Sequence, residues 1–182
     1  MGRILTTEEE WAEQLQSFEH TAFRLEQQRE YWEPEERATI ERFIAGNPEP
    51  PDQVPEFRPW FELVARHAAE RKRMERVRIH EDPPTPVQRW LRYIDPWNTK
   101  AGETIRYMTR QRAYEVGLLP ALGADDWWLF DSCRLLVMRF DGHGHRVENE
   151  LITDPERVVQ ACAWRDLAVH HSTSDIARGR AA

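Results

Sequence analysis

The spacing of apolar side chains divides the chain into helical and extended segments. Apolar positions at helical spacing predict helices over residues 7–18, 34–45, 59–73, 86–95 and 155–171, with a short helical turn over 111–116. Short apolar or alternating runs bounded by turn residues predict strands over residues 74–80, 103–108, 127–131, 134–140 and 146–152. Residues 20–26 also alternate and are predicted as a strand, although their glutamine-rich continuation leaves a helix open.

Capping residues and prolines mark the ends of these helices. Thr7, Thr85 and Asp154 are each expected to cap a helix, because their side-chain oxygens can accept hydrogen bonds from the first free backbone amides. Pro96 is expected to stop or kink the fourth helix, since proline has no amide hydrogen. Asp141-Gly142 is typical of a hairpin turn, because glycine adopts the positive φ that such turns need.

The order of these elements predicts an α+β fold, with a mixed or antiparallel sheet covered by helices. Residues 47–59 contain five prolines and indicate a linker across the surface. We therefore expect residues 1–50 to form an N-terminal helical arm packed on an α+β body of residues 59–171. The small and polar residues 172–182 are expected to form a disordered tail.

Composition narrows the classes of function. The formal net charge of −7 disfavours nonspecific nucleic-acid binding over the whole surface. Cys133 and Cys162 are far apart in segments predicted to be ordered, which indicates buried thiols in a reducing compartment. The sequence shows no secretory signal and no apolar run of membrane-spanning length. We therefore expect a cytoplasmic protein without membrane contact.

One basic cluster lies where a helix gives way to a strand. It has five cations in the eight residues 71–78. Arg71, Arg73, Arg76 and Arg78 are candidates to contact phosphate groups or acidic groups on a partner. In an acidic protein the same arginines can instead pair with the chain's own glutamates, so both interpretations stay open.

A second candidate site lies at one edge of the predicted sheet. Asp126, Asp141 and His143 fall at the same end of the strands, whereas Asp131 falls at the opposite end, roughly 20 Å away. The His143-Gly144-His145 spacing lacks a second ligand pair that would make a zinc site specific. We therefore assign no metal ligand here.

The sequence contains none of the common catalytic or cofactor motifs. A GxGxxG loop, a Walker P-loop, and HExxH, GxSxG and HxK patterns are all missing. We assign no catalytic residue and no cofactor, while a catalytic set assembled in space stays open.

Short patterns spread over residues 11–171 resemble a known family. They are His20–Glu26, Gly46, Arg76–Arg78, Gly102–Arg106, Asp126–Asp131, Arg139–Gly142, Glu150–Pro155 and Trp164–Asp166. Together they look like landmarks of the actinobacterial domain-of-unknown-function family numbered 6879. That family has no assigned activity, and its members are often encoded near helix-turn-helix regulators. The resemblance therefore implies an association with regulation.

The succession of elements is also similar to a degenerate phospholipase-D-like domain. The likeness follows a basic strand, a Gly-Glu-x-Ile-Arg strand, a strand ending in Phe-Asp, a hairpin and a helix that starts at Asp-Pro. The catalytic signature of phospholipase D is HxK followed by an acid, and this chain has no HxK. The resemblance therefore implies binding without hydrolysis.

The expected function is a noncatalytic regulatory or protein-interaction module, in the simplest case an accessory of a helix-turn-helix regulator. Four tryptophans near proline-rich breaks are candidates for partner contact, with burial in the core as the alternative: Trp32, Trp60, Trp90 and Trp97. A phosphoesterase or nuclease-like enzyme is one alternative, using Arg76, Arg78, Asp126, Asp131 and a histidine. A nucleic-acid-binding accessory is another. The oligomeric state stays open.

Overall fold

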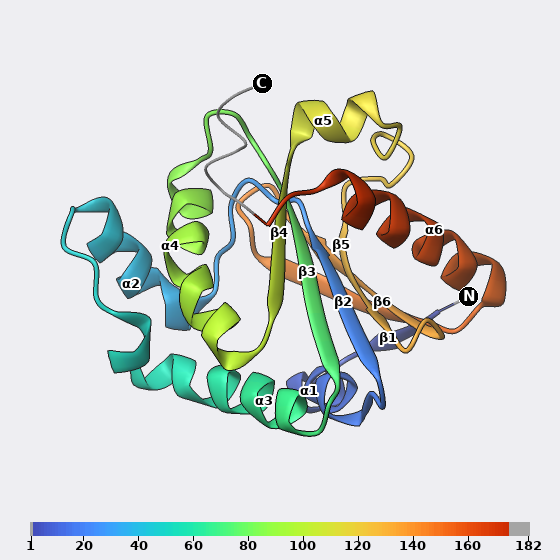
Figure 1. Ribbon diagram of the computed structural model, residues 1–182, viewed down its shortest axis with the longest axis horizontal. Coiled ribbons are helices and arrows are strands. Elements are labelled where there is room, and N and C mark those ends of the chain that lie inside the picture. The colour runs from blue at the N-terminus through green and yellow to red at the C-terminus, as the bar shows by residue number, and fades with distance from the viewer. Residues whose placement is uncertain (1, 175–182) are drawn as a thin grey trace.

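The computed structural model describes residues 2–174, and these residues form an α+β fold. A seven-stranded mixed sheet lies between two layers of helices (Figure 1). The fold class predicted from the sequence is therefore confirmed.

The elements follow the predicted order closely. The strands are β1 (Arg3–Leu5), β2 (Thr21–Glu26), β3 (Arg73–His80), β4 (Thr104–Thr109), β5 (Asp126–Phe130), β6 (Arg134–Phe140) and β7 (Arg146–Ile152). The helices are α1 (Glu8–Ser17), α2 (Pro34–Ile44), α3 (Arg58–Ala69), α4 (Pro86–Ala101), α5 (Arg110–Glu115) and α6 (Pro155–His171). Two 3₁₀ turns, η1 (Pro51–Gln53) and η2 (Pro55–Phe57), fill the proline-rich stretch. The short strand β1 was not predicted.

The strand order is β1-β7-β6-β5-β2-β3-β4. β2, β3 and β4 run parallel, and every other neighbouring pair is antiparallel. Parallel neighbours need a crossover, and here the connections from β2 to β3 and from β3 to β4 contain α2, α3 and α4. The parallel half of the sheet is therefore built from helix-connected strands, and the antiparallel half from a meander closed by β1.

The first fifty residues are part of the sheet and are not a helical arm alone. β2 lies between β5 and β3, near the middle of the sheet, and β1 forms one edge. At the other end of the chain, Thr173 pairs with Tyr107 on β4 in an antiparallel bridge. The rest of the expected tail, from residue 175 on, lies outside the described residues.

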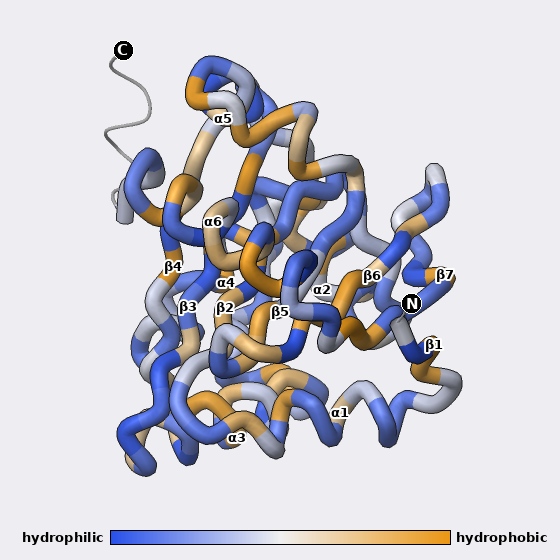
Figure 2. Tube along the Cα trace, turned by 90° about the vertical axis from the view of Figure 1, so that its right-hand side faces the viewer, coloured by the Kyte–Doolittle hydropathy of each residue, from blue (hydrophilic) through white to orange (hydrophobic). Residues whose placement is uncertain are grey.

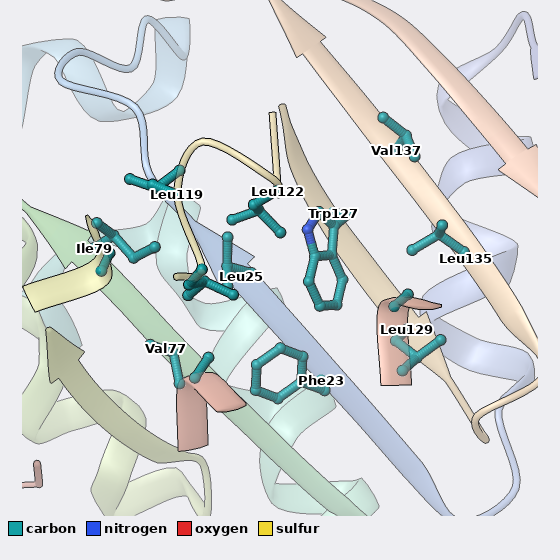
Figure 3. Close-up of a cluster of buried hydrophobic side chains, with 14 of the residues drawn as sticks. Phe23, Leu25, Val77, Ile79, Leu119, Leu122, Trp127, Leu129, Leu135 and Val137 are labelled. Carbon is teal, nitrogen blue, oxygen red and sulfur yellow. The ribbon is translucent and has the colours of Figure 1, made fainter. Parts of the chain in front are cut away.

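One face of the sheet carries an aliphatic and aromatic core. Strand alternation places Phe23, Val77, Trp127 and Leu135 on this face, and Figure 3 shows them gathered across four strands. Helices α5 and α6 lie against it, and Figure 2 shows both on the side of the sheet opposite α1 and α3. Apolar contacts therefore fill this face without a polar layer.

The opposite face is mixed in character. Near β1, β6 and β5 it buries apolar side chains such as Leu136 and Trp128 beneath α1 and α3. Near β2 and β3 the same face presents Arg24, Arg76 and Arg78. Helices α2 and α4, together with η1 and η2, cover that charged region through their own apolar cluster. Charged side chains are thus enclosed between two layers of secondary structure.

Helix α4 continues through Pro96, so this proline does not stop the helix. A proline inside a helix removes one backbone hydrogen bond, and tertiary contacts on both sides can hold the helix together. Asp95 binds Arg78, and Asn98 accepts a hydrogen bond from Trp60. The Thr7, Thr85 and Asp154 caps are confirmed.

Two further expectations are corrected by the structure, one for Cys133 and one for the hairpin glycine. Cys133 is exposed in the turn between β5 and β6 rather than buried. Trp90 is buried in the core, which was the alternative considered for it from the sequence. In the hairpin between β6 and β7, the positive φ belongs to Gly144 (φ 85°) and not to Gly142. The reason is packing, since Gly144 lies against the backbone of Glu30 and its carbonyl accepts a hydrogen bond from Trp32 N–H.

Gly144→Ala is expected to lower the free energy of unfolding by about 1–3 kcal/mol. A Cβ at this position would lie 2.7 Å from the carbonyl oxygen of Glu30. The matched control is Gly142→Ala, which meets nothing within 4 Å and should change stability by less than about 0.5 kcal/mol. Urea unfolding of the two variants measures both values, and equal losses would contradict this account of the hairpin.

Candidate functional site

Seven charged side chains gather between the parallel strands and the α4 layer. We call them the buried charge cluster: Arg24, Glu26, Arg76, Arg78, Asp95, Glu103 and Asp126. Six are buried, and the side chain of Arg24 is 16% exposed. Buried charges are stable only when they are paired and hydrogen-bonded, so the arrangement of partners decides what the cluster can do.

Glu26, at the end of β2, is the centre of the cluster. Its Oε1 accepts a hydrogen bond from Arg76 Nη1 at 2.9 Å and lies 2.9 Å from Arg24 Nε. Its Oε2 accepts a hydrogen bond from Arg78 Nη1. Burial alone would raise the pKa of Glu26, but the three surrounding guanidinium groups lower it to about 2. Glu26 is therefore a permanent anion shared by three cations.

Two further carboxylates accept hydrogen bonds from Arg76 and Arg78, the two arginines of β3 in the cluster. Asp95 on α4 accepts two hydrogen bonds from Arg78, at 3.1 Å from Nε and 2.8 Å from Nη2. Glu103, just before β4, accepts one from Arg76 Nε at 2.8 Å. Burial would lower the pKa of both arginines, but the carboxylates raise it above the usual arginine value. Every side-chain nitrogen of Arg78 thus donates to a carboxylate of its own chain.

Asp126 closes the cluster at the start of β5. Its Oδ2 accepts a hydrogen bond from Tyr31 Oη at 2.6 Å, and its Oδ1 accepts one from Gln27 N–H at 2.9 Å. The nearest cation, Arg24 Nη2, is 4.0 Å away. Burial is the main cause that raises the pKa of Asp126 to about 6, with the charge of Glu26 adding to it. The charge of the Asp126 carboxylate is therefore only partly balanced by a neighbouring cation.

Tryptophan rings support the arginines from the apolar side. Arg76 lies over the rings of Trp60 and Trp128, at 5.6 and 5.8 Å from their centres, and Arg24 lies 5.4 Å from Trp128. A guanidinium over an aromatic face gains electrostatic attraction that strengthens when water is excluded. Trp60 in turn donates a hydrogen bond to Asn98 at 3.0 Å, which ties α3 to α4.

A cavity of about 410 Å³ borders the buried charge cluster. Six aromatic side chains line it: Trp11, Tyr31, Phe57, Trp60, Phe61 and Phe140. Its charged lining consists of Arg24, Arg76, Arg78 and Arg146 with Glu8, Glu26, Glu33, Glu36 and Glu56. A concave space of this size that combines aromatic walls with many charged groups can hold a small polar molecule.

Glu36 on α2 is an acid of this lining whose pKa, in contrast to that of Glu26, is raised. Burial is the main cause that raises its pKa to about 7, and the charges of Glu33 and Glu26 raise it further. Arg24 and Arg78 act in the opposite direction without restoring the usual value. Within the described residues, the Glu36 carboxylate has no hydrogen bond or ion pair. The cavity therefore contains an acid that lacks a bonded cation.

A second, shallower hollow of about 350 Å³ lies between α3 and α4. Trp97 and Phe61 line it together with Ala65 and Lys100. Trp97 is half-buried and packs on Tyr93 with ring centres 5.5 Å apart. Of the four tryptophans considered from the sequence, Trp97 is the one in this outer hollow.

The structure separates the candidate arginines into two pairs. Arg76 and Arg78 lie in the buried charge cluster, within hydrogen-bond distance of carboxylates. Arg71 lies in the loop before β3 with a positive φ of 62°, and Arg73 is exposed at the first position of the strand. The four residues therefore do not form one continuous surface strip.

The sheet-edge candidates lie at one end of the sheet but have different partners. Asp126 pairs in register with Met138, and Asp141 follows the end of β6, so both are at the same end. Asp126 is buried against Tyr31, whereas Asp141 accepts hydrogen bonds from the backbone of His143 and His145 within the hairpin. The His143 backbone thus contributes to the turn.

Asp131 has a structural role at the opposite end of β5. Its carboxylate accepts hydrogen bonds from the amides of residues 19, 20 and 21 at 2.7–2.9 Å, which fixes the start of β2. Among residues 2–174, no group of three or more histidine, cysteine, aspartate and glutamate side chains is arranged to hold a metal ion.

Several cluster residues were not among the sequence candidates, namely Arg24, Glu26, Asp95 and Glu103. A signal for two of them was present, because Arg24 and Glu26 alternate with Phe23 and Leu25 and so must share the face of β2 opposite the apolar core. Asp95 gave no such signal, since its partner lies on another element.

Comparison with known proteins agrees with this fold. The DUF6879 family, described as a domain of unknown function, matches residues 9–175. No curated protein matches the chain. A solved structure of Nuc from Salmonella typhimurium, a phospholipase D family member, is similar with a TM-score of 0.50 and 9% sequence identity, over 87% of this chain and 84% of that one. That likeness concerns the fold alone.

No helix within the described residues is both long and apolar enough to cross a membrane.

Glu26→Gln is expected to lower the free energy of unfolding by about 3 kcal/mol or more, because it leaves buried arginines without their shared anion. Glu75→Gln is the matched control, since Glu75 on β3 forms a part-exposed ion pair with Arg106 at 3.0 Å and should lose less than about 1 kcal/mol. Urea unfolding at pH 7 measures both. Similar losses in the two variants would show that Glu26 does not organise the cluster.

The contribution of Glu36 and Asp126 to stability is expected to rise as the pH falls from 8 to about 5, whereas His67 and His80, whose pKa values are lowered by burial, act in the opposite direction. Glu36 and Asp126 have pKa values raised to about 7 and about 6, so the folded protein takes up protons that the unfolded chain does not yet bind. Below pH 4.5 the trend reverses, because Glu26 keeps its charge in the folded protein down to about pH 2 and its contribution is lost on protonation.

Urea unfolding between pH 4 and pH 8 measures this profile. Asp126→Asn should reduce the change between pH 4 and pH 8 by about 2–3 kcal/mol, since the amide has no proton to bind. An Asp126→Asn profile that runs parallel to that of the unaltered protein from pH 4 to pH 8 would contradict the assignment of Asp126.

Proposed function

The chain belongs to the DUF6879 family, and we propose that it is a noncatalytic regulatory module that binds a protein partner. The partner we infer is a helix-turn-helix transcriptional regulator, because the sequence resemblance implies that such regulators are encoded beside members of the family. The proposed place of action is the cytoplasm of an actinobacterium.

The observation that carries this proposal is the state of the two β3 arginines. Arg76 and Arg78 are the cations that the phosphoesterase alternative needs for phosphate contact. Both donate hydrogen bonds to Glu26, and each donates to one further carboxylate. A guanidinium whose donors are occupied by buried carboxylates stabilises the fold and has little capacity left for phosphate. These contacts favour a binding scaffold over a phosphoryl-transfer site.

The acids of the enzyme alternative also have structural partners. Asp126 is bound by Tyr31 and the Gln27 amide, and Asp131 caps the backbone at the start of β2. The two residues lie at opposite ends of β5, and His143 belongs to the hairpin beyond β6. No single reacting group could contact all of them, so the enzyme alternative has less support than binding.

The outer hollow between α3 and α4 is the contact surface we favour for the partner. Aromatic side chains are enriched at protein interfaces, and Trp97 presents a half-buried ring there beside apolar Phe61 and Ala65. Asp52 and Glu62 line it together with Arg58 and Lys100, so polar contacts of both signs surround the aromatic ring. The hollow therefore offers a partner an aromatic anchor flanked by charged groups that can form ion pairs.

Affinity purification of the full chain from its native host tests the proposal. We expect one protein with a helix-turn-helix domain to co-purify in a fixed ratio. Trp97→Ala should reduce the recovered partner at least tenfold, because it removes the aromatic anchor. Tyr114→Ala is the control, since Tyr114 is 55% exposed on α5, which lies on the opposite face of the sheet.

Two results would overturn the proposal. One is a chain that is recovered alone, or with the same partner at the same yield after Trp97→Ala. The other is hydrolysis of a phosphodiester such as bis-p-nitrophenyl phosphate that is lost in Arg78→Met.

A further inference from the structure

The cavity beside the buried charge cluster has more acids than arginines in its lining. Five glutamates and four arginines line it. Each of the four arginines has a carboxylate partner within the chain. Arg24, Arg76 and Arg78 share Glu26, and Arg146 pairs with Glu8 at 2.9 Å. The positive charges of the lining are therefore already neutralised.

The carboxylates are less well satisfied than the arginines. Glu36 lines the cavity from α2 and has no bonded cation within the described residues. Glu56 also lines the cavity, from η2, and is exposed at its edge. Behind the arginines, Asp95, Glu103 and Asp126 add negative charge to the same region. The cavity therefore has an excess of negative charge, and a ligand that binds there should bring a positive charge.

The apolar walls of the cavity set a second requirement for a ligand, which is an apolar part that can pack against them. Tyr31, Phe57 and Phe140 present aromatic surface to the cavity, and Leu91 and Ile94 of α4 add aliphatic surface. Aromatic faces attract cations and bury apolar groups at the same time. A ligand that satisfies both the walls and the unpaired acid must carry a positive charge on an apolar body.

We propose that this cavity binds a small organic amine, with its ammonium group at Glu36 and its apolar body against Tyr31 and Phe57. A primary ammonium donates three hydrogen bonds, and a carboxylate at the wall accepts them without displacing any existing ion pair. The volume of about 410 Å³ matches a ligand with an aromatic ring and a short chain. The inference rests on the proposed binding role and makes this amine the regulatory effector of the module.

Binding should depend on pH in a defined direction. Glu36 is faced by Glu33 at the start of its own helix, by Arg24 and Glu26 from β2, and by Arg78 from β3. With these neighbours its pKa is about 7, so the carboxylate is mostly protonated at pH 6 and mostly charged at pH 8. An amine that stays protonated over this range should therefore bind more tightly at pH 8, with release of a proton from Glu36.

Isothermal titration calorimetry of the full chain tests the inference with three matched probes. They are phenethylamine, the neutral 2-phenylethanol and the anionic 3-phenylpropionate. At pH 8 the amine should bind at least tenfold more tightly than the alcohol, and the carboxylate should bind weakest. The affinity for the amine should fall severalfold at pH 6, and the affinity for the alcohol should not change.

Two variants on α2 locate the ammonium group. Glu36→Gln should weaken amine binding about tenfold and leave the alcohol unchanged, and this amide should fold because it replaces an acid that burial already holds partly neutral. Glu41→Gln is the control, since Glu41 forms an exposed ion pair with Arg37 and should bind the amine like the unaltered protein. A melting curve of each variant confirms folding.

Three outcomes would overturn the inference. They are equal or tighter binding of 3-phenylpropionate, amine binding that survives Glu36→Gln, and no binding of phenethylamine or of hexylamine as a second amine. Each leaves capture of the regulator unaffected, so the amine site can fail while the proposed partner stands. If amine binding is intact but no regulator is captured, the proposed partner fails while the amine site stands.

Discussion

The interaction on which the rest of the structure depends is the sharing of Glu26 by three arginines. A charge taken out of water is costly unless a partner lies within hydrogen-bond distance, and removal of one partner from a buried pair costs about 3–5 kcal/mol. Glu26 joins β2 to β3 through Arg76 and Arg78. The outer hydrogen bonds of these arginines then fix α4 through Asp95 and the start of β4 through Glu103. The relative position of four elements is therefore set by one chain of ion pairs, while apolar packing sets the other face of the sheet.

The two faces of the sheet solve the packing problem in different ways, and the cavity is a result of that difference. Apolar side chains on the α5 and α6 face can shift and interdigitate until no space remains. Guanidinium and carboxylate groups need fixed distances and angles, so the helices above them cannot settle freely onto the sheet. Prolines in η1 and η2 further restrict the segment that covers this face. The cavity beside the buried charge cluster is therefore lined by these charged groups on one side and by aromatic side chains of the covering segments on the other.

Local signals in the sequence were sufficient for most of the fold. Apolar spacing and caps predicted the six α-helices of the described residues, and apolar or alternating runs predicted six of the seven strands of the described sheet. β1 was missed because three residues are too few for a pattern, and the end of α4 lies beyond Pro96 because tertiary contacts override a local preference. The candidate site was predicted less well. Alternation placed Arg76 and Arg78 on the face opposite Val77, but it could not show that α4 covers that face or that Asp95 lies above it. Pairing across distant elements has no local signature.

The central position of β2 also affects how the chain can fold as it is synthesised. Residues 21–26 are made early, yet their neighbours on both sides arrive much later. Arg76 meets Glu26 across 50 residues, and Asp126 meets the Gln27 amide across 99 residues. Closing such long loops costs chain entropy before the contacts repay it, which slows folding of sheets with distant pairings. On the ribosome, Glu26 emerges 50 residues before Arg76, so water must solvate its charge until β3 has followed. The charges at the centre of the folded protein are thus the hydrated side chains of β2 while that strand has no neighbours.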